Sequence, residues 1–173
     1  MKHKCNCGRG AVFIRKYEGR AYCKVCFSRQ IERKIKSTIR NDDLLRKNDR
    51  INAIGYNSAV IKFILKKYFQ PWDLQVSNKG KNIKSEDADD LSLEIFKSAM
   101  QGNILQIKKT NSPLRHIPEN ELLLYSKINK IKLKKKKLNR FEKNLKKILD
   151  DLEQKRPGTK YQIQTFAERL DNE

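Results

Sequence analysis

Residues 5–40 read CNCGRGAVFIRKYEGRAYCKVCFSRQIERKIKSTIR. Two closely spaced cysteine pairs lie on either side of a short segment and lead directly into a basic stretch. One residue separates Cys5 from Cys7, two separate Cys23 from Cys26, and fifteen lie between the pairs. This spacing is close to that of a four-thiolate zinc ribbon, in which two knuckles hold one tetrahedral ion. The sequence therefore predicts that these four cysteines bind Zn²⁺.

The first knuckle is irregular, because its gap is one residue shorter than the usual two. His3 could therefore replace Cys5 as the first ligand. Between the pairs, residues 11–14 and 20–22 are β-prone runs joined by a turn at residues 17–19. A hairpin this small buries too little apolar surface to fold alone, so the metal would supply the missing stability. Two disulfide bridges are the weaker alternative, because such frameworks are typical of short secreted chains.

The segment after the second cysteine pair has the pattern of an amphipathic helix. Apolar residues recur every four positions, which places them on one helical face. These residues are Phe27, Ile31, Ile35 and Ile39. The remaining surface carries Arg29, Arg33, Lys34, Lys36 and Arg40. A solvated basic face would explain this pattern, but it continues the charge of the ribbon and so predicts a surface that faces RNA.

The whole chain is strongly basic. Its 173 residues include 40 Lys and Arg against 20 Asp and Glu, a net charge of +20. Basic residues outnumber acidic ones by 15 to 5 in residues 1–50, by 9 to 6 in 51–110 and by 16 to 9 in 111–173. Such an excess repels itself in a compact state unless a polyanion neutralises it, and nucleic acid is the first candidate. A lysine-rich composition without any such partner is the alternative.

Neither a membrane span nor a secretory signal is expected. The sequence has no apolar run of about 18 residues, and Lys2, His3 and Lys4 are followed by Cys and Gly rather than by an apolar stretch. Cysteines in knuckle spacing fit a reducing compartment. We therefore expect a cytoplasmic protein without membrane contact.

The middle of the chain has a strand, a turn and a helix in succession. Residues 50–54 are strand-like, residues 55–58 form a turn with one glycine, and an apolar helix follows from Ala59. Backbone amides at such a helix N-terminus can hold a phosphate. Asn57 or Ser58 acting as a plain N-cap would explain the same residues.

The last third is helical by pattern. One helix is expected from Pro118 and Glu119 onward, and another ends before Pro157. The buried stripe of the second helix is predicted to comprise Phe141, Leu145, Ile148, Leu149 and Leu152, and a short closing helix to bury Ile163, Phe166 and Leu170. Between the first two helices lies the lysine run Lys134, Lys135, Lys136 and Lys137, which could be a solvated helix face or a tract that contacts phosphates.

Several segments together resemble the TtuA-like PP-loop tRNA 2-thiolation family. The order of zinc knuckles, basic helix, strand and Gly turn is similar to that family. So are residues 87–90 followed by Met100-Gln101-Gly102-Asn103, and the PGTKY of residues 157–161. The most specific piece is PLRHIPENELLLY, residues 113–125. The resemblance implies ATP-dependent sulfur insertion into tRNA through an SGGxDS phosphate loop and cysteines that often carry an iron–sulfur cluster.

The departures from the family fall on its chemistry. At the phosphate loop this chain has Ile54-Gly55-Tyr56-Asn57-Ser58, so one glycine and a serine are missing and Asn replaces Asp. Fewer glycines mean fewer backbone amides that can converge on a pyrophosphate. No cysteine remains outside the ribbon for a persulfide or a cluster. A degenerate ATP site would comprise Gly55, Asn57, Ser58, Asp89 and Asp90, although the two aspartates also fit the first turn of a helix.

These observations predict a mostly helical α+β protein. We expect a zinc ribbon at residues 1–27, a basic helix with a truncated PP-loop-like α/β remnant at 28–110, and a C-terminal helical region with the lysine run at 111–173. The first functional hypothesis is a non-catalytic, zinc-stabilised protein, a pseudoenzyme, that binds tRNA or ribosomal RNA, the latter on the ribosome, without ATP. The second is an active or partner-dependent subunit of tRNA uridine thiolation. The third is a partner of an intact thiolation paralogue, docked through the face of Phe27, Ile31, Ile35 and Ile39 and through the C-terminal helices.

Overall fold

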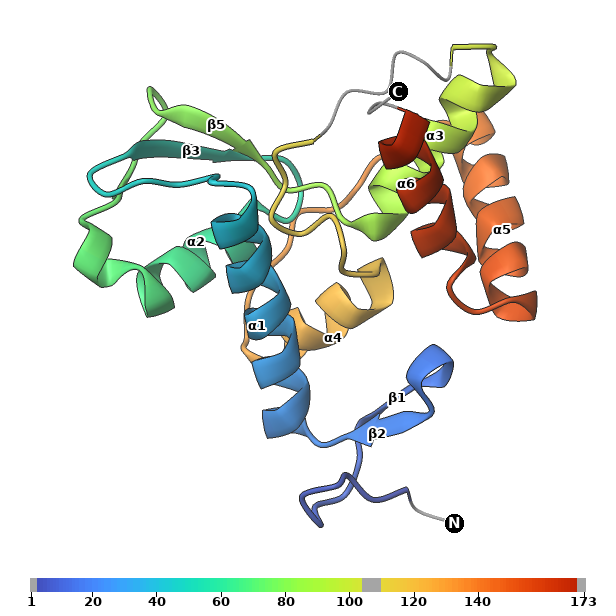
Figure 1. Ribbon diagram of the computed structural model, residues 1–173, viewed down its shortest axis with the longest axis horizontal. Helices are drawn as coiled ribbons and strands as arrows, with labels where there is room; N and C mark the ends of the chain where they lie inside the picture. The colour runs from blue at the N-terminus through green and yellow to red at the C-terminus, as the bar shows by residue number, and fades with distance from the viewer. Residues whose placement is uncertain (1–2, 104–109, 171–173) are drawn as a thin grey trace.

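The computed structural model describes residues 3–103 and 110–170. It is a mostly helical α+β protein, as predicted, with two small sheets and six helices in the described residues. Figure 1 shows the N-terminal ribbon at the bottom, a sheet with α1 and α2 beneath it, and α3, α5 and α6 gathered on the right. Within the described residues, no helix has both the length and the apolar character that crossing a membrane requires.

The ribbon is a short hairpin followed by a long helix. β1 (Phe13–Arg15) pairs antiparallel with β2 (Arg20–Tyr22), and the 3-10 turn η1 (Lys16–Glu18) connects them. Gly19 closes this turn with a φ of 63°, a conformation that costs glycine little. The predicted runs and turn are therefore present: β2 has the predicted bounds, and the first run and the turn are shifted by a residue or two.

Helix α1 (Lys24–Asn41) buries the face that its periodicity predicts. Phe27, Ile31, Ile35 and Ile39 are each no more than 1% exposed and belong to the main hydrophobic core. Burial of such a face, rather than helix propensity, supplies most of a helix's stability in a protein. The expectation that this face docks onto a paralogue is wrong, because the face packs inside the chain's own core.

The second sheet has three parallel strands in the order β4-β3-β5. β3 (Arg50–Ile54) leads into α2 (Ser58–Tyr68), the turn η2 (Gln70–Trp72), β4 (Gln75–Val76) and β5 (Lys81–Lys84). Strand β3 and helix α2 agree with the prediction. β5 was not predicted, because Ile83 is its one buried residue and residues 77–82 had the composition of a polar linker.

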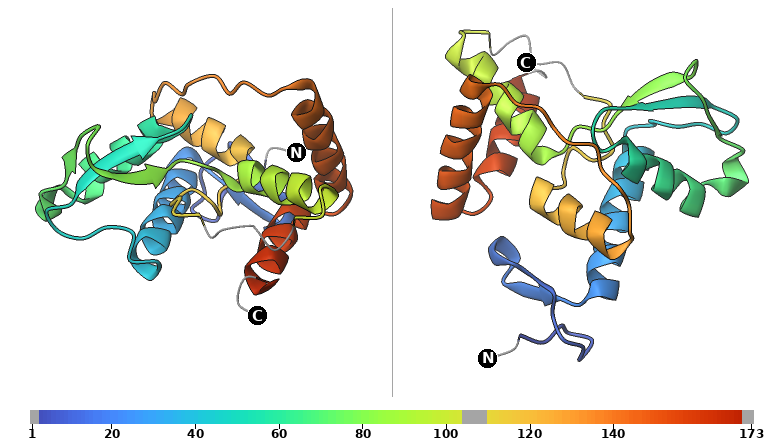
Figure 2. Two further views of the ribbon diagram at one scale, coloured as in Figure 1. Left: turned by 90° about the horizontal axis from the view of Figure 1, so that it is seen from above. Right: turned by 180° about the vertical axis from the view of Figure 1, so that it is seen from behind.

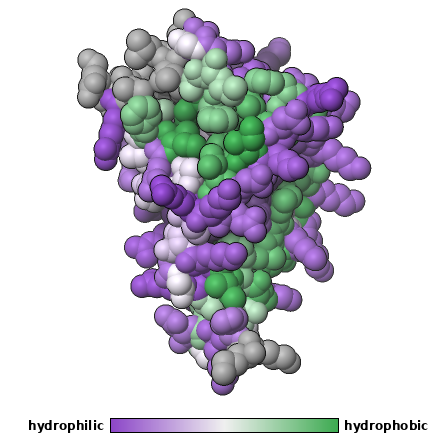
Figure 3. All heavy atoms as spheres, turned by 90° about the vertical axis from the view of Figure 1, so that its right-hand side faces the viewer, coloured by the Kyte–Doolittle hydropathy of each residue, from purple (hydrophilic) through white to green (hydrophobic). Residues whose placement is uncertain are grey.

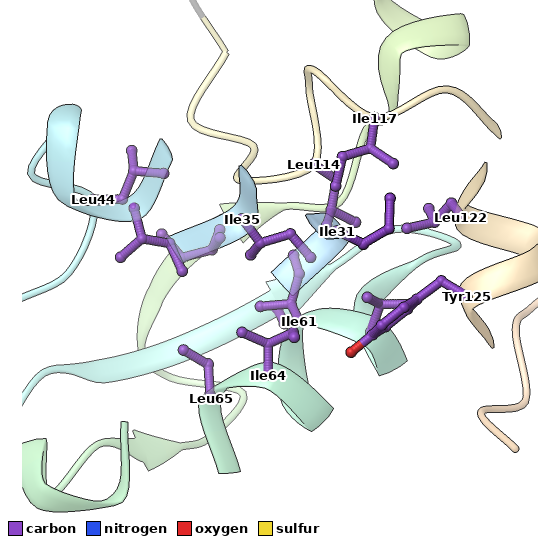
Figure 4. Packing of buried hydrophobic residues seen from close by; sticks show 14 of the residues in the cluster. Ile31, Ile35, Leu44, Ile61, Ile64, Leu65, Leu114, Ile117, Leu122 and Tyr125 are labelled. Atoms are coloured by element: carbon purple, nitrogen blue, oxygen red, sulfur yellow. The ribbon is translucent and has the colours of Figure 1, made fainter. Parts of the chain in front are cut away.

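The main core joins elements from the whole chain. Figure 4 shows Ile31 and Ile35 of α1 meeting Ile61 and Ile64 of α2, with Leu122 of α4 beside them. Residues of all three predicted segments, 1–27, 28–110 and 111–173, contribute to this one cluster. Because each segment buries its apolar side chains against the others, the ribbon, α1 and the sheet hold one another in position.

A buried carboxylate connects three helices inside this core. Glu32 of α1 is 3% exposed and accepts hydrogen bonds from Lys67 at 2.7 Å, from Tyr125 at 3.0 Å and from the Tyr68 hydroxyl. Burial alone would raise the pKa of Glu32, but these donors lower it overall. The paired carboxylate fixes α2 and α4 (Glu119–Ile128) against α1.

The remaining helices form a smaller cluster. α3 (Ala88–Met100), α5 (Arg140–Lys155) and α6 (Thr159–Leu170) pack around Leu93, Leu145 and Leu149. The predicted stripe of α5 is only half right, because Phe141, Ile148 and Leu152 are 41–46% exposed. Phe166 of α6, also expected to be buried, is 58% exposed. Figure 3 shows apolar side chains on this side of the molecule, bordered by charged ones.

The lysine run lies outside any helix. Residues 131–139 form an extended connection between α4 and α5, which crosses the back of the molecule in Figure 2. Ile131 and Leu133 pack against the main core and Leu138 against the smaller one. Of the two alternatives for the run, the solvated helix face is therefore excluded, since these residues are not helical and apolar contacts flank the lysines.

Candidate functional site

The four cysteines come together at the ribbon end of α1. Their Sγ atoms all lie within 4.8 Å of one another, and those of Cys7 and Cys23 are 3.5 Å apart. The first knuckle is closed by two backbone hydrogen bonds, from Gly8 N to Cys5 O at 2.8 Å and from Cys5 N to Arg9 O at 2.9 Å. Cys23 occupies the N-cap of α1, where the positive end of the helix dipole favours a thiolate.

Backbone amides prepare this group for a cation. Hydrogen bonds from the amides of Cys7 and Cys23 lower the pKa of the Cys5 thiol to about 6, and the amide of Cys26 lowers the pKa of Cys23. Hydrogen bonding with Cys7, Cys23 and Cys5 instead raises the pKa of Cys26 to about 12. A divalent cation bound by all four sulfurs would stabilise each cysteine, including Cys26, as a thiolate, since metal ligands bind in that form.

The donor set fits a single tetrahedral ion. With a Zn–S distance of about 2.3 Å, the sulfurs of such an ion lie about 3.8 Å apart, which agrees with the observed spacing. A four-iron cluster takes one cysteine for each iron, so its four sulfurs would lie farther apart. His3 is exposed and does not belong to the group of possible ligands found in the described residues, which contains Cys5 itself.

A buried ion pair fastens the ribbon to the rest of the protein. Arg15 is 2% exposed, and its Nε and Nη2 atoms donate to the two carboxylate oxygens of Glu121 at 2.8 and 2.6 Å. Its Nη1 donates to Glu18 at 3.0 Å, and its guanidinium lies 5.1 Å from the centre of the Tyr22 ring. Because Glu121 is in the first turn of α4, this pair fixes the hairpin relative to that helix.

The predicted phosphate loop lies at the carboxyl edge of the parallel sheet, which we define as residues 55–58 together with 85–90. The φ of Gly55 is 102°, and a Cβ there would lie 2.4 Å from Ser85 Oγ. The amide of Asn57 donates to Ser85 Oγ at 3.1 Å. Its side chain makes no cap bond but donates to Ser85 O at 3.1 Å and to Asp87 Oδ2 at 3.2 Å. Ser85 and Asp87, which follow β5, therefore already accept the hydrogen bonds of Asn57 that would otherwise be available to a phosphate.

Acidic residues and one lysine complete this edge. Asp87 caps α3 and forms a capping box with Asp90, as expected for acidic residues at a helix start. Burial, followed by the nearby charge of Asp89, raises the pKa of Asp87 to about 7. Lys136 reaches in from the lysine run to pair with Asp90, and the amide of Lys134 donates to Tyr56 O at 3.3 Å. The lysine run thus lies across the loop.

A cleft of about 1150 Å³ opens beside the start of α4. We call it the ribbon cleft. One wall is the hairpin with α1, including Ile14, Tyr17 and Lys34, and the other is formed by α5 and α6. The start of α4 lies between them, and Asp89 contacts it there: Asp89 Oδ2 accepts the amide of Glu119 at 2.7 Å and Oδ1 pairs with Lys160 of α6. Asp89 thus joins three helices.

The basic residues predicted for nucleic acid divide into separate surfaces. Arg29, Arg33 and Arg40 are exposed along one face of α1, and Lys36 lies 4.2 Å from the centre of the Tyr68 ring. Lys34 points away from this face toward the ribbon cleft, where its ammonium is 3.4 Å from the Tyr17 hydroxyl. In the lysine run, Lys134, Lys135 and Lys137 are exposed whereas Lys136 is ion-paired.

Sequence reasoning missed the buried charges that position these surfaces. Arg15, Glu32, Arg115 and Glu121 are each at most 7% exposed, and Arg115 pairs with Asp42. Glu32 and Glu121 occupy helix positions whose neighbours three or four residues away are apolar, such as Ile35 and Tyr125. A charge on an apolar helical face was the available signal.

No family model matches the chain. A protein of Methanocaldococcus jannaschii described as a probable sulfurtransferase is 23% identical to it over 265 residues, spanning 96% of this chain and 77% of that protein. The alignment is longer than this chain of 173 residues, so the relative carries segments without a counterpart here. The solved U34-tRNA thiolase NcsA from Methanococcus maripaludis, with its [4Fe-4S] cluster, matches 98% of this chain and 87% of its own at 20% identity with a TM-score of 0.81.

The chain is thus similar over most of its length to a probable sulfurtransferase and, in fold, to a tRNA thiolase. The segments that resemble this thiolation family converge on the ribbon cleft, because residues 115–121 and residues 157–161 both contribute to its lining. Asp89 and Lys160, which come from two of these segments, contact each other. Much of the family-like sequence therefore shapes this cleft rather than the carboxyl edge.

Proposed function

We propose that this protein is a zinc-stabilised RNA-binding member of the thiolation family that does not itself transfer sulfur. The observation that carries the proposal is the filled carboxyl edge. There Ser85 and Asp87 take the hydrogen bonds of Asn57, and the Ser85 hydroxyl leaves no room beside Gly55. A nucleotide phosphate would have to displace these contacts and approach two buried aspartates, Asp87 and Asp89.

The placement of the cysteines supports the same proposal. The sequence has four cysteines, and all four belong to the ribbon cluster. If they hold Zn²⁺, as their spacing favours, no thiol of this chain is left to carry a persulfide or to ligate a second cluster.

RNA binding rests on the charge that remains exposed. Arg29, Arg33 and Arg40 on α1 and three lysines of the 134–137 run are exposed side chains in a chain of net charge +20. Contacts of this kind reach phosphates and give affinity without base specificity. The partner is tRNA or ribosomal RNA, and the protein acts in the cytoplasm.

Two measurements test the proposal. Purified protein supplied with tRNA, ATP and sulfide should yield no thiolated nucleoside by mass spectrometry, and formation of one would overturn the non-catalytic part. Binding to tRNA should weaken steeply with salt. Replacing Lys134, Lys135 and Lys137 by Gln should reduce the slope of log K against log salt by about two, from about 0.7 to 0.9 per phosphate contact. The matched control replaces Lys62, Lys66 and Lys79, which are also exposed, and an equal loss there would contradict a role for the run.

A further inference from the structure

The lining of the ribbon cleft holds as many basic as acidic side chains, but they are not all paired with one another. Its lining contains six acidic residues, and each already has a partner within the protein. Asp42 pairs with Arg115, Glu119 with Lys146 and Glu121 with Arg15. Asp89 and Asp150 share Lys160, and Glu153 accepts the amides of Gly158 and Lys160 at 2.7 and 2.9 Å.

Two cations of the lining remain without a carboxylate contact among the described residues. Lys16 is exposed at the mouth, and Lys34 is half-buried in the wall with the Tyr17 hydroxyl as its hydrogen-bond partner. Burial, followed by the neighbouring charge of Arg15, lowers the pKa of Lys34, and the more distant charges of Glu121 and Glu18 offset only part of this shift. A half-buried ammonium near a guanidinium is costly, and an anion that enters the cleft would offset that cost.

Exposed aromatic rings border the same space. Tyr17 on the hairpin is 47% exposed and Tyr161 on α6 is 61% exposed, and both line the cleft. His116 also lines it, with its ring centre 6.5 Å from that of Tyr161. Exposed aromatic faces beside cations are the recurring arrangement with which proteins hold unstacked bases of single-stranded nucleic acid.

We propose that the ribbon cleft binds one unstacked nucleotide of single-stranded RNA, with its base against Tyr161 or Tyr17 and its phosphate at Lys34 and Lys16. This inference rests on the proposed RNA-binding function and assigns part of that binding to a defined place. The cleft volume is sufficient, because pockets of about 300 to 1,000 Å³ enclose molecules of this size.

The test compares a labelled 12-nucleotide oligouridylate with a duplex RNA of the same length by fluorescence anisotropy. Tyr161→Ala and Lys34→Gln should each weaken binding of the single strand about tenfold and that of the duplex less than twofold. Tyr56→Ala and Lys66→Gln are the matched controls, because Tyr56 is 39% exposed and Lys66 is exposed, both outside the cleft lining. Photo-crosslinking of a 4-thiouridine probe should modify the peptide that contains Tyr161.

The outcomes separate this inference from the proposed function. If the unaltered protein binds the oligonucleotide and tRNA but Tyr161→Ala and Lys34→Gln behave like the controls, the cleft assignment is overturned and RNA binding stands. If the unaltered protein binds no RNA at low salt, both fail. Loss of the single strand in Tyr161→Ala with unchanged circular dichroism supports the cleft, since a folding defect would also alter the spectrum.

Discussion

The carboxyl edge and the ribbon cleft differ in where their polar groups find partners. At the edge, Asn57 donates to Ser85 and Asp87, Lys136 pairs with Asp90, and an added atom at Gly55 would collide with Ser85. In the cleft, the acids are satisfied, but among the described residues neither Lys34 nor Lys16 contacts a carboxylate. A site that completes its own hydrogen bonds has no driving force to bind a ligand, whereas an incomplete one does.

The largest expected effect comes from removing the metal. Cys23→Ser removes one of the four sulfur ligands, so the hairpin should lose its fixed structure and the cleft one wall. Hydrogen exchange should show loss of amide protection in residues 11–22 and little change in β3 and β5. The metal content should fall from one Zn²⁺ per chain, and intact amide protection without metal would contradict the assigned role.

Breaking the ion pair between ribbon and body should have the next largest effect. Arg15→Met leaves Glu121 buried without its partner, which costs about 3–5 kcal/mol. The double variant Arg15→Met with Glu121→Leu should recover more than half of this loss in urea unfolding. Equal losses in the single and the double variant would show that Arg15 acts through packing rather than through charge.

The closed edge is tested by Gly55→Ala. The new Cβ meets Ser85 Oγ at 2.4 Å at a φ of 102°, so the free energy of unfolding should fall by about 1–3 kcal/mol. Gly102→Ala is the control, because φ there is 73° with no atom within 4 Å of the Cβ. A similar loss at both positions would mean that backbone strain alone is responsible and that the edge is not tightly filled.

A pH dependence is expected at the same edge as well. The pKa of Asp87 rises from 3.8 to about 7 on folding, so the folded state holds this proton more tightly than the unfolded chain does. Its contribution to the free energy of unfolding therefore decreases as pH rises from about 4 to about 7, by at most about 1.4 kcal/mol per pH unit. Asp87→Asn should flatten this part of the profile in urea titrations, while Asp151→Asn, an exposed acid, should leave it unchanged.

The elements with a strong local pattern could be predicted from the sequence. The four-residue spacing of Phe27 to Ile39 gave both α1 and its buried face, and the cysteine spacing gave the cluster. Strand β5 could not be found, because Ile83 alone is buried and its pairing depends on β3, some thirty residues earlier. The exposure of one side of α5 was also not predicted. The spacing of Phe141, Ile148 and Leu152 indicates an apolar face, but it does not show how much of that face the neighbouring helices cover.

The site was harder to predict than the fold. Lys34 was grouped with the other basic residues of α1. It lies five positions after Arg29, however, and this spacing places its side chain on another side of the helix. The lysine run was recognised as charged, but the ion pair of Lys136 with Asp90 depends on a long-range crossing. Contacts between residues far apart in the chain leave no local pattern, which is why the cleft was absent from the sequence interpretation.

The two buried charges of the N-terminal part also set the order of events during synthesis. Tyr125, which donates to Glu32, is synthesised 93 residues after it, and Glu121, the partner of Arg15, is synthesised 106 residues after it. A nascent chain therefore lacks these two partners until translation has passed α4, although Lys67 can pair with Glu32 and Glu18 with Arg15 earlier. Metal capture by the ribbon, whose ligands are complete by residue 26, can stabilise the N-terminal part before then.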